Sequence, residues 1–213
     1  MPAAELPPLY VICDQDACER AGWRLVDFAD ACMDGGATLL QLRAKHAGGR
    51  ALLAAADEVV RRANEVSARV VLNDRADIAA LAGAHGVHVG QEDLSPADVR
   101  RVTGDAALVG LSTHTTAQFG DGLRSPSDYL AIGPVFATAS KATGYEAVGL
   151  ERVREVSALA DGRTTIVAIG GITLESAASV IAAGARSVAV IGDLLAGGDP
   201  AARVRKYLEL LKV

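Results

Sequence analysis

The sequence is poor in cysteine and in aromatic residues, and each shortage narrows the class of protein. Three cysteines, Cys13, Cys18 and Cys32, occur among 213 residues. This small, odd number does not fit a disulfide framework and favours buried thiols in a reducing compartment. Aromatic residues make up 4% of the chain although 50% of it is hydrophobic. We therefore predict a core built mainly from Ala, Val, Leu and Ile.

An excess of positive charge is also missing. The chain has 21 Lys and Arg against 26 Asp and Glu, a formal net charge of -5, which disfavours a nucleic-acid partner. No apolar run approaches the roughly 20 residues of a membrane span, and the first eight residues lack the basic and apolar segments of a signal peptide. We expect a cytoplasmic protein that acts on small molecules, with no membrane partner; homo-oligomerisation is left open.

Short β-rich runs alternate with longer helical patterns along the whole chain. Eight such runs, most of them apolar throughout as buried parallel strands are, predict a single (β/α)8 TIM barrel domain over residues 1–213. The expected strands are 9–13, 38–43, 69–73, 86–89, 108–112, 129–136, 165–169 and 187–191. Helical patterns between them cover 24–33, 50–66, 76–82, 97–102, 150–160, 174–183 and 200–211. An open, doubly wound sheet is the alternative, but it would show fewer strands and a glycine-rich turn after the first.

Three strong hydrogen-bond donors close the second expected strand. Gln41, Arg43 and Lys45 stand two residues apart, so in a strand their side chains project to one face. An amide, a guanidinium and an ammonium together make a poor core and a good anion site.

Further polar residues follow other expected strands, where catalytic residues of such barrels lie. Asn73 and Asp74 end the third strand and Asp93 follows the fourth; Ser112 ends the fifth, and Lys141 follows the sixth. Carboxylates set among cations suggest Mg²⁺ shared with a pyrophosphate. The sequence therefore predicts a metal site at Asp74 and Asp93.

A second anion site is predicted after the seventh and eighth strands. Gly170-Gly171 and Ile191-Gly192 occupy the positions where many barrels bind phosphate through backbone amides. The glycine pair leads directly into a helix, whose N-terminus would add its dipole. A tight turn that needs positive φ is the other explanation of the glycine pair. Two anions, a pyrophosphate and a monophosphate, imply displacement of pyrophosphate.

The order of these motifs resembles the thiamine-phosphate synthase family. The resemblance covers nearly the whole chain and is carried by Gln41-x-Arg43-x-Lys45, Leu72-Asn73-Asp74-Arg75, Gly86-Val87-His88-Val89-Gly90-Gln91-Glu92-Asp93, Ser112-x-His114, Gly133-Pro134-Val135-Phe136-x-Thr138-x-Ser140-Lys141 and Ile169-Gly170-Gly171-Ile172. It implies a (β/α)8 barrel that couples 4-amino-5-hydroxymethyl-2-methylpyrimidine diphosphate to a thiazole monophosphate, giving thiamine monophosphate and pyrophosphate.

The resemblance also implies a role for each matching residue. The residues implied to contact the pyrimidine diphosphate are Gln41, Arg43, Lys45, Asn73, Ser112 and Lys141. Asp74 and Asp93 are implied to bind Mg²⁺. The residues implied to bind the thiazole phosphate are Thr138, Ser140, Gly171, Ile191 and Gly192. In the implied dissociative mechanism pyrophosphate leaves first, with Arg43, Lys45 and Lys141 aimed at the developing charge and Ser112 beside them.

One departure and two rival functions stay open. The family usually has Ser where this chain has Gly192, so one hydroxyl contact to the phosphate is lost. Related thiazole tautomerases share the fold and use a histidine in the region of His114, whose role as an orienting group or a base stays open. A non-catalytic sensor of phosphate ligands is the second rival. Retention of Asp74, Asp93 and the cations favours the synthase.

Overall fold

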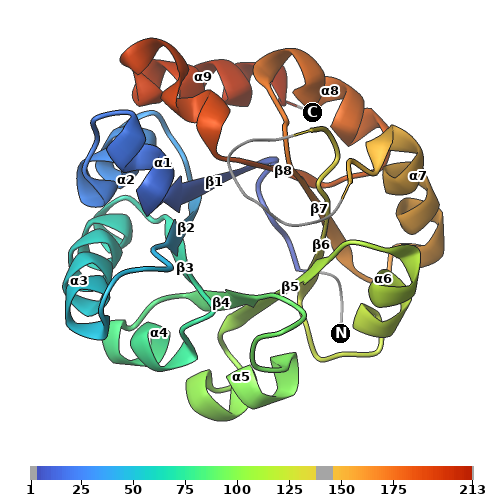
Figure 1. Ribbon diagram of the computed structural model, residues 1–213, viewed down its shortest axis with the longest axis horizontal. Coiled ribbons are helices and arrows are strands. Elements are labelled where there is room, and N and C mark those ends of the chain that lie inside the picture. The colour runs from blue at the N-terminus through green and yellow to red at the C-terminus, as the bar shows by residue number, and fades with distance from the viewer. Residues whose placement is uncertain (1–3, 138–145, 213) are drawn as a thin grey trace.

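Eight parallel strands, paired in chain order, close a barrel in the computed structural model, which describes residues 4–137 and 146–212 (Figure 1). The first and last strands complete the ring, with Leu9 opposite Val188. The predicted (β/α)8 fold is confirmed. The strands are β1 (Leu9–Asp14), β2 (Leu39–Arg43), β3 (Arg69–Asn73), β4 (Gly86–Val89), β5 (Leu108–Thr113), β6 (Tyr129–Ile132), β7 (Thr165–Ile169) and β8 (Ser187–Val190).

Helices ring the outside of the barrel (Figure 1). They are α1 (Gln15–Arg20), α2 (Leu25–Asp34), α3 (Gly49–Glu65), α4 (Ala76–Ala82), α5 (Pro96–Thr103), α6 (Thr116–Gly122), α7 (Gly149–Ala160), α8 (Leu174–Ala182) and α9 (Pro200–Leu210); a 3₁₀ helix, η1, covers Gly192–Gly198. Ser95 caps α5, because its Oγ accepts from Asp98 N at 3.2 Å. Among the helices of the described residues, none is long and apolar enough to cross a bilayer.

Side chains of successive strand residues alternate between two apolar clusters. One cluster fills the barrel interior and includes Tyr10, Ile12, Val71 and Tyr129. The other lies between the strands and the helices, and holds intervening residues such as Val11. Because a strand has a period of two, every polar residue in register with the interior cluster points into the barrel.

The sequence predicted strand positions well and one strand end badly. At one end of each of four strands, β1, β2, β5 and β8, the predicted bound differs from the observed one by a single residue. In contrast, β6 ends at Ile132, four residues before the predicted Phe136. Pro134 has no N–H to continue a ladder, and Val135 N instead donates to Ile169 O at 2.8 Å. The short α1 and α6 were not among the predicted helical patterns; each begins at a capping side chain, Asp14 and Thr115.

The outer cluster should dominate stability. Leu72 in β3 is fully buried in it, whereas Leu81 at the end of α4 is 71% exposed. We expect Leu72→Ala to lower the free energy of unfolding by about 2–5 kcal/mol, and the matched Leu81→Ala to change it by about 0.5 kcal/mol or less. Urea denaturation measures both; equal losses would contradict the assigned packing.

Candidate active site

Gln41 and Arg43 point into the carboxyl end of the barrel, hereafter the mouth, from the inward register of β2. The Arg43 guanidinium forms an ion pair through Nη1 with Asp14, its neighbour in the β1–β2 ladder. The Asp14 side chain is 1% exposed, and its Oδ1 also accepts from Ala17 N at 2.9 Å. Arg43 is thus held in one orientation, and its buried Nε has no hydrogen-bond partner among the described residues.

Lys45 lies beyond the end of β2, in the turn that follows, so the predicted three-residue face is only partly strand. Its Nζ still reaches the mouth, 3.3 Å from Asp74 Oδ2. Asp74 follows β3 with φ of +62°, and its backbone N donates to His88 O at 2.8 Å. The cation and the carboxylate therefore meet because the ends of β2 and β3 are adjacent in the sheet.

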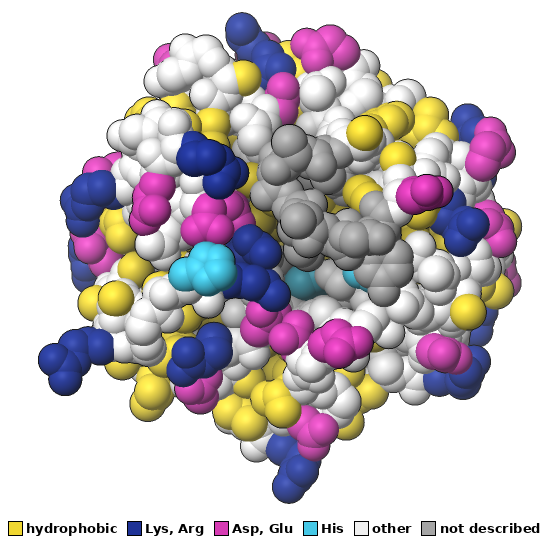
Figure 2. Space-filling model, in the orientation of Figure 1, with side chains coloured by type: hydrophobic (Ala, Val, Ile, Leu, Met, Phe, Trp, Pro, Cys, Tyr) yellow, Lys and Arg dark blue, Asp and Glu magenta, His cyan; other side chains and the backbone are white. Residues whose placement is uncertain are grey.

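Asp74 and Asp93 form a carboxylate pair. Burial, followed by hydrogen bonding and repulsion from Asp93, raises the pKa of Asp74, and Lys45 opposes that shift. Asp93 is fixed by its loop, because its Oδ2 accepts from Gly90 N at 2.8 Å. Acidic and basic side chains lie together near the centre of this face (Figure 2). Two hard oxygen donors that repel each other fit a divalent cation such as Mg²⁺.

Asn73 and Ser112 join the cationic residues inside the barrel. Gln41, Arg43, Asn73, Ser112 and Ile191 line one small interior space. The structure thus brings together the inward residues of β2, β3 and β5 that were predicted separately from sequence.

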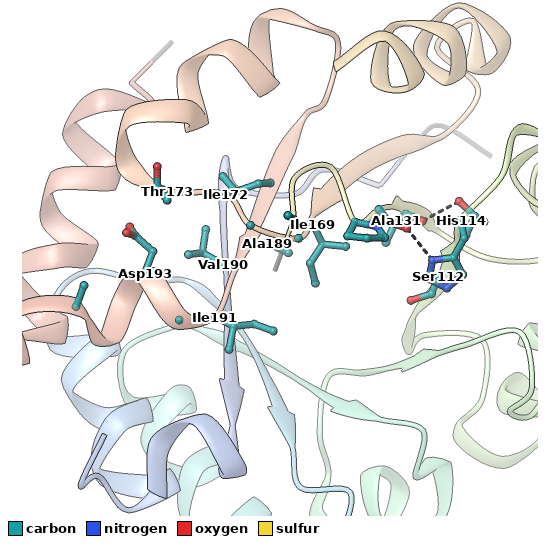
Figure 3. Close-up of a pocket in the computed structure, with 18 residues that line it drawn as sticks. Ser112, His114, Ala131, Ile169, Ile172, Thr173, Ala189, Val190, Ile191 and Asp193 are labelled. Atoms are coloured by element: carbon teal, nitrogen blue, oxygen red, sulfur yellow. Dashed lines mark hydrogen bonds between the residues drawn. The ribbon is translucent and has the colours of Figure 1, made fainter. Parts of the chain in front are cut away.

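A larger cavity of about 420 Å³ opens beside that space. Ser112, Ile169 and Ile191 line both, so the two are adjacent. Figure 3 shows the side chains of β7 and β8 on one side of the larger cavity and Ser112 and His114 on the other. Gly171 and Gly192, both predicted for the second anion, also line this cavity.

The glycine pair after β7 is required by its own geometry. Gly170 and Gly171 have φ of +103° and +63°. A Cβ on Gly171 would lie 2.5 Å from Ala137 O and 2.8 Å from Phe136 Cβ. The tight-turn explanation is therefore sufficient for both glycines, and their use in phosphate binding stays a prediction.

The expectation that α8 adds its dipole to this site needs correction. Leu174 N, at the start of α8, donates to Asp193 Oδ2 at 3.2 Å. The same carboxylate accepts from Arg203 Nε at 3.0 Å and from Tyr207 Oη at 2.6 Å. Because Asp193 already lies at the start of α8, its carboxylate competes there with an anion. Gly192, at the start of η1, is not among the glycines with positive φ.

His114 lies at the opposite wall of the cavity. Its Nδ1 lies 2.7 Å from Gly133 O (Figure 3), and a carbonyl can only accept, so Nδ1 carries the proton. Its backbone N donates to Gln118 Oε1 at 2.8 Å. These contacts orient the ring, and a role of His114 as a base stays a prediction.

Three predicted site residues lie outside the described part of the chain. They are Thr138, Ser140 and Lys141, and their expected contacts to thiazole phosphate and pyrophosphate stay predictions.

Sequence reasoning missed several polar residues of the site. Asp14 and Asp193 stand next to strand ends, a signal that could have identified them. Tyr10 and Tyr129 lie within apolar runs, where a tyrosine is indistinguishable from an ordinary core residue. Their hydroxyls, with Gln41 and His88, form a buried network inside the barrel.

The sequence of this chain is similar to those of known proteins. A family model described as thiamine monophosphate synthase matches residues 9–194. The chain belongs to the thiamine monophosphate synthase family. A thiamine-phosphate synthase of Koribacter versatilis is 48% identical over 209 residues, covering 97% of both chains. That of Synechococcus sp. WH7803 is 42% identical over 92% of this chain, which spans about half (54%) of that longer protein.

A solved structure agrees with the family assignment. The thiamine phosphate pyrophosphorylase from Pyrococcus furiosus superposes with a TM-score of 0.85 at 27% identity, covering 95% of this chain and 94% of that one. The sequence resemblance to the family is thereby confirmed.

The glycine turn provides a matched pair of substitutions. Gly22 and Gly171 both have positive φ, but a Cβ on Gly22 would meet nothing within 4 Å. Gly22→Ala should cost about 1 kcal/mol of unfolding free energy, from backbone strain alone. Gly171→Ala should cost about 2–4 kcal/mol, since the 136–137 segment must also move. Denaturation of both variants measures the difference, and equal costs would refute the close packing of the turn.

The carboxylate pair makes a prediction about stability and pH. Because the folded-state pKa of Asp74 is raised, its ionised form destabilises the fold; this penalty is absent at low pH, develops as pH rises above the unfolded-state pKa and is complete above the folded-state pKa. Asp74→Asn should therefore stabilise the metal-free protein at pH 7, by about 0.5–1 kcal/mol, and leave stability at pH 3 nearly unchanged.

Asp77→Asn is the control for that prediction. A hydrogen bond from Arg75 lowers the pKa of Asp77, so ionised Asp77 favours the fold and its replacement should slightly destabilise the protein at pH 7. Thermal unfolding at both pH values checks the opposite signs. A destabilised Asp74→Asn protein at pH 7 would contradict the repulsion.

Proposed function

We propose that the chain couples an aminopyrimidine methyl diphosphate to a thiazole monophosphate, forming thiamine monophosphate and releasing pyrophosphate. The supporting observation is the joint arrangement at the mouth: cations and paired carboxylates lie beside a cavity that opens onto a glycine turn. Family membership gives the same reaction class, a transferase.

The cationic end suits the diphosphate. Arg43 and Lys45 supply two positive charges from fixed positions, and the guanidinium can meet two phosphate oxygens at once. Asp74 and Asp93 would hold Mg²⁺, which when bound neutralises part of the negative charge on the leaving pyrophosphate. Lys141, outside the described residues, is proposed to act on the same group.

The larger cavity suits the thiazole phosphate. Ile169, Ile172 and Val190 supply apolar lining, which a heteroaromatic ring favours. Backbone at Gly171, Ile191 and Gly192 is proposed to meet the phosphate, with Thr138 and Ser140 beside it. Because the two spaces share lining residues, a thiazole nitrogen is proposed to face the pyrimidine methylene.

The chemistry is proposed to begin with departure of pyrophosphate. Arg43 and Lys45 stabilise the charge that develops on the leaving group, and the apolar lining keeps water from the cation that forms. The thiazole nitrogen then attacks the methylene carbon. The three cysteines offer no competing nucleophile, because they are buried and burial raises the pKa of each thiol.

An assay with both substrates and Mg²⁺ tests this function. We expect thiamine monophosphate and pyrophosphate in equal amounts. Asp93→Ala should lower kcat by about 100-fold or more, the scale of losing a strong electrostatic element. The control Asp98→Ala changes a solvent-exposed acid of α5 and should leave kcat within about twofold.

Other outcomes identify the rivals. Isomerisation of a thiazole without use of the pyrimidine would indicate the tautomerase, with His114 as the candidate base. Binding of the phosphate ligands without turnover would indicate a sensor. Near-normal turnover of Asp93→Ala at saturating substrates would reject the metal assignment.

A further inference from the structure

Five side chains from five strands form one continuous hydrogen-bonded chain across the barrel interior. Gln41 Nε2 donates to Tyr10 Oη at 2.9 Å, and Tyr10 Oη lies 3.0 Å from Tyr129 Oη. Tyr129 Oη lies 2.9 Å from His88 Nδ1, and His88 Nε2 lies 2.8 Å from Ser112 Oγ. Both ends of this interior chain, Gln41 and Ser112, line the small interior space of the proposed site, and Tyr10 and His88 line it as well.

The middle of the interior chain is tightly packed. Tyr10, Tyr129 and His88 are 1%, 0% and 8% exposed. The His88 ring stacks on Tyr129 with centroids 5.5 Å apart, and Tyr10 meets Tyr129 edge to face at 6.0 Å. Gly110 of β5 makes room for the pair, since a Cβ there would lie 2.3 Å from Tyr129 Oη and 2.5 Å from His88 Nδ1. Substitution at any of these positions would disturb the contact.

Each buried phenol has one proton to place. Burial raises the pKa of Tyr10 and of Tyr129, so both remain neutral. Tyr10 accepts from Gln41, and it therefore donates to Tyr129. Tyr129 in turn donates to His88 Nδ1, which leaves the ring proton on Nε2, facing Ser112 Oγ.

The reverse direction produces a conflict. If Ser112 donated to His88 and Nδ1–H donated to Tyr129, then Tyr129 would donate to Tyr10. The Tyr10 hydroxyl would then lie between two donors, Tyr129 and the Gln41 amide. An imidazolium at His88 leads to the same conflict, because its Nδ1–H also has to donate to Tyr129. The Tyr10 proton would then have no acceptor, which is costly for a buried donor. With Gln41 Nε2 facing Tyr10, one direction is therefore selected.

We propose that Tyr10, Tyr129 and His88 are positioning residues that keep Ser112 as a hydrogen-bond donor, and the Gln41 carbonyl as an acceptor, toward the pyrimidine substrate. This inference rests on the proposed function. With its oxygen accepting from His88, Ser112 has its own proton for a ring nitrogen or a phosphate oxygen. Because Gln41 Nε2 donates to Tyr10 Oη, Gln41 can present Oε1 as an acceptor to an amino group. An aminopyrimidine carries this pair of complementary atoms.

The tautomer of His88 can be measured without any substrate. The chain has four histidines, and the signals of His88 in the ¹⁵N-histidine-labelled full chain are those that His88→Gln removes. We expect Nε2 protonated and Nδ1 unprotonated. Tyr129→Phe keeps the stacked ring but removes the donor to Nδ1, so both nitrogen signals should move toward a mixture of tautomers. Tyr10→Phe keeps the Tyr129 hydroxyl and should leave the tautomer unchanged.

Kinetics then test the consequence for the substrate. Tyr129→Phe should raise the KM for the pyrimidine diphosphate by about tenfold, the effect of one lost hydrogen bond, and change the KM for thiazole phosphate by less than about twofold. Tyr207→Phe is the matched control, because Tyr207 is equally buried but donates to Asp193 outside the barrel interior. It should leave both the His88 signals and the pyrimidine KM unchanged.

The outcomes separate this inference from the proposed function. A wild-type His88 protonated at Nδ1, or signals unmoved in Tyr129→Phe, would overturn the assigned direction. If Tyr129→Phe raised the KM values for both substrates equally, or if Tyr207→Phe raised the pyrimidine KM as much as Tyr129→Phe does, Tyr10 and Tyr129 would have only a structural role. A wild-type chain that makes no thiamine monophosphate would reject the function, whereas the NMR result stands whether or not turnover occurs.

Discussion

The alternation of side chains in a closed parallel barrel is the constraint on which the site depends. Every second residue of each strand points inward, and a closed barrel has no edge strand at which an inward polar side chain could reach solvent. Gln41, Arg43, Asn73, His88 and Ser112 are therefore concentrated in a narrow space. The chain has a formal net charge of -5, yet its mouth holds several cations. The barrel geometry, and not the overall composition, brings these charges together.

The fold was predictable because its signal is distributed over the whole chain. Apolar runs long enough for strands recur at barrel spacing, and β3, β4 and β7 have the predicted bounds. Failures occurred where local chemistry outweighed the pattern. Pro134 ended β6 early. The six residues of α1 are too few to show a helical period, and Gly120 and Gly122 weaken the helical pattern of α6, so the capping residues were their clearest signal.

The site was predictable in its charges and not in its supporting contacts. Arg43, Lys45 and Asp74 could be inferred because charged residues after apolar runs require an explanation. The positions of Asp14 and Asp193 beside strand ends could have marked them as site residues. Their partners, Arg43 and the start of α8, are distant in sequence, so no local spacing reveals what they hold. The roles of Tyr10 and Tyr129 depend on hydroxyl contacts across the barrel, and these exist only once the strands have closed.

The contacts of Asp193 with Leu174, Arg203 and Tyr207 imply that the two parts of the site form at different times during synthesis. Residues 41–112, which carry the cationic end, leave the ribosome well before Arg203 and Tyr207, the residues that hold Asp193. A nascent chain that lacks α9 has every strand of the barrel but cannot anchor the loop after β8. The proposed thiazole side of the site is therefore expected to be the last part of the site to become ordered.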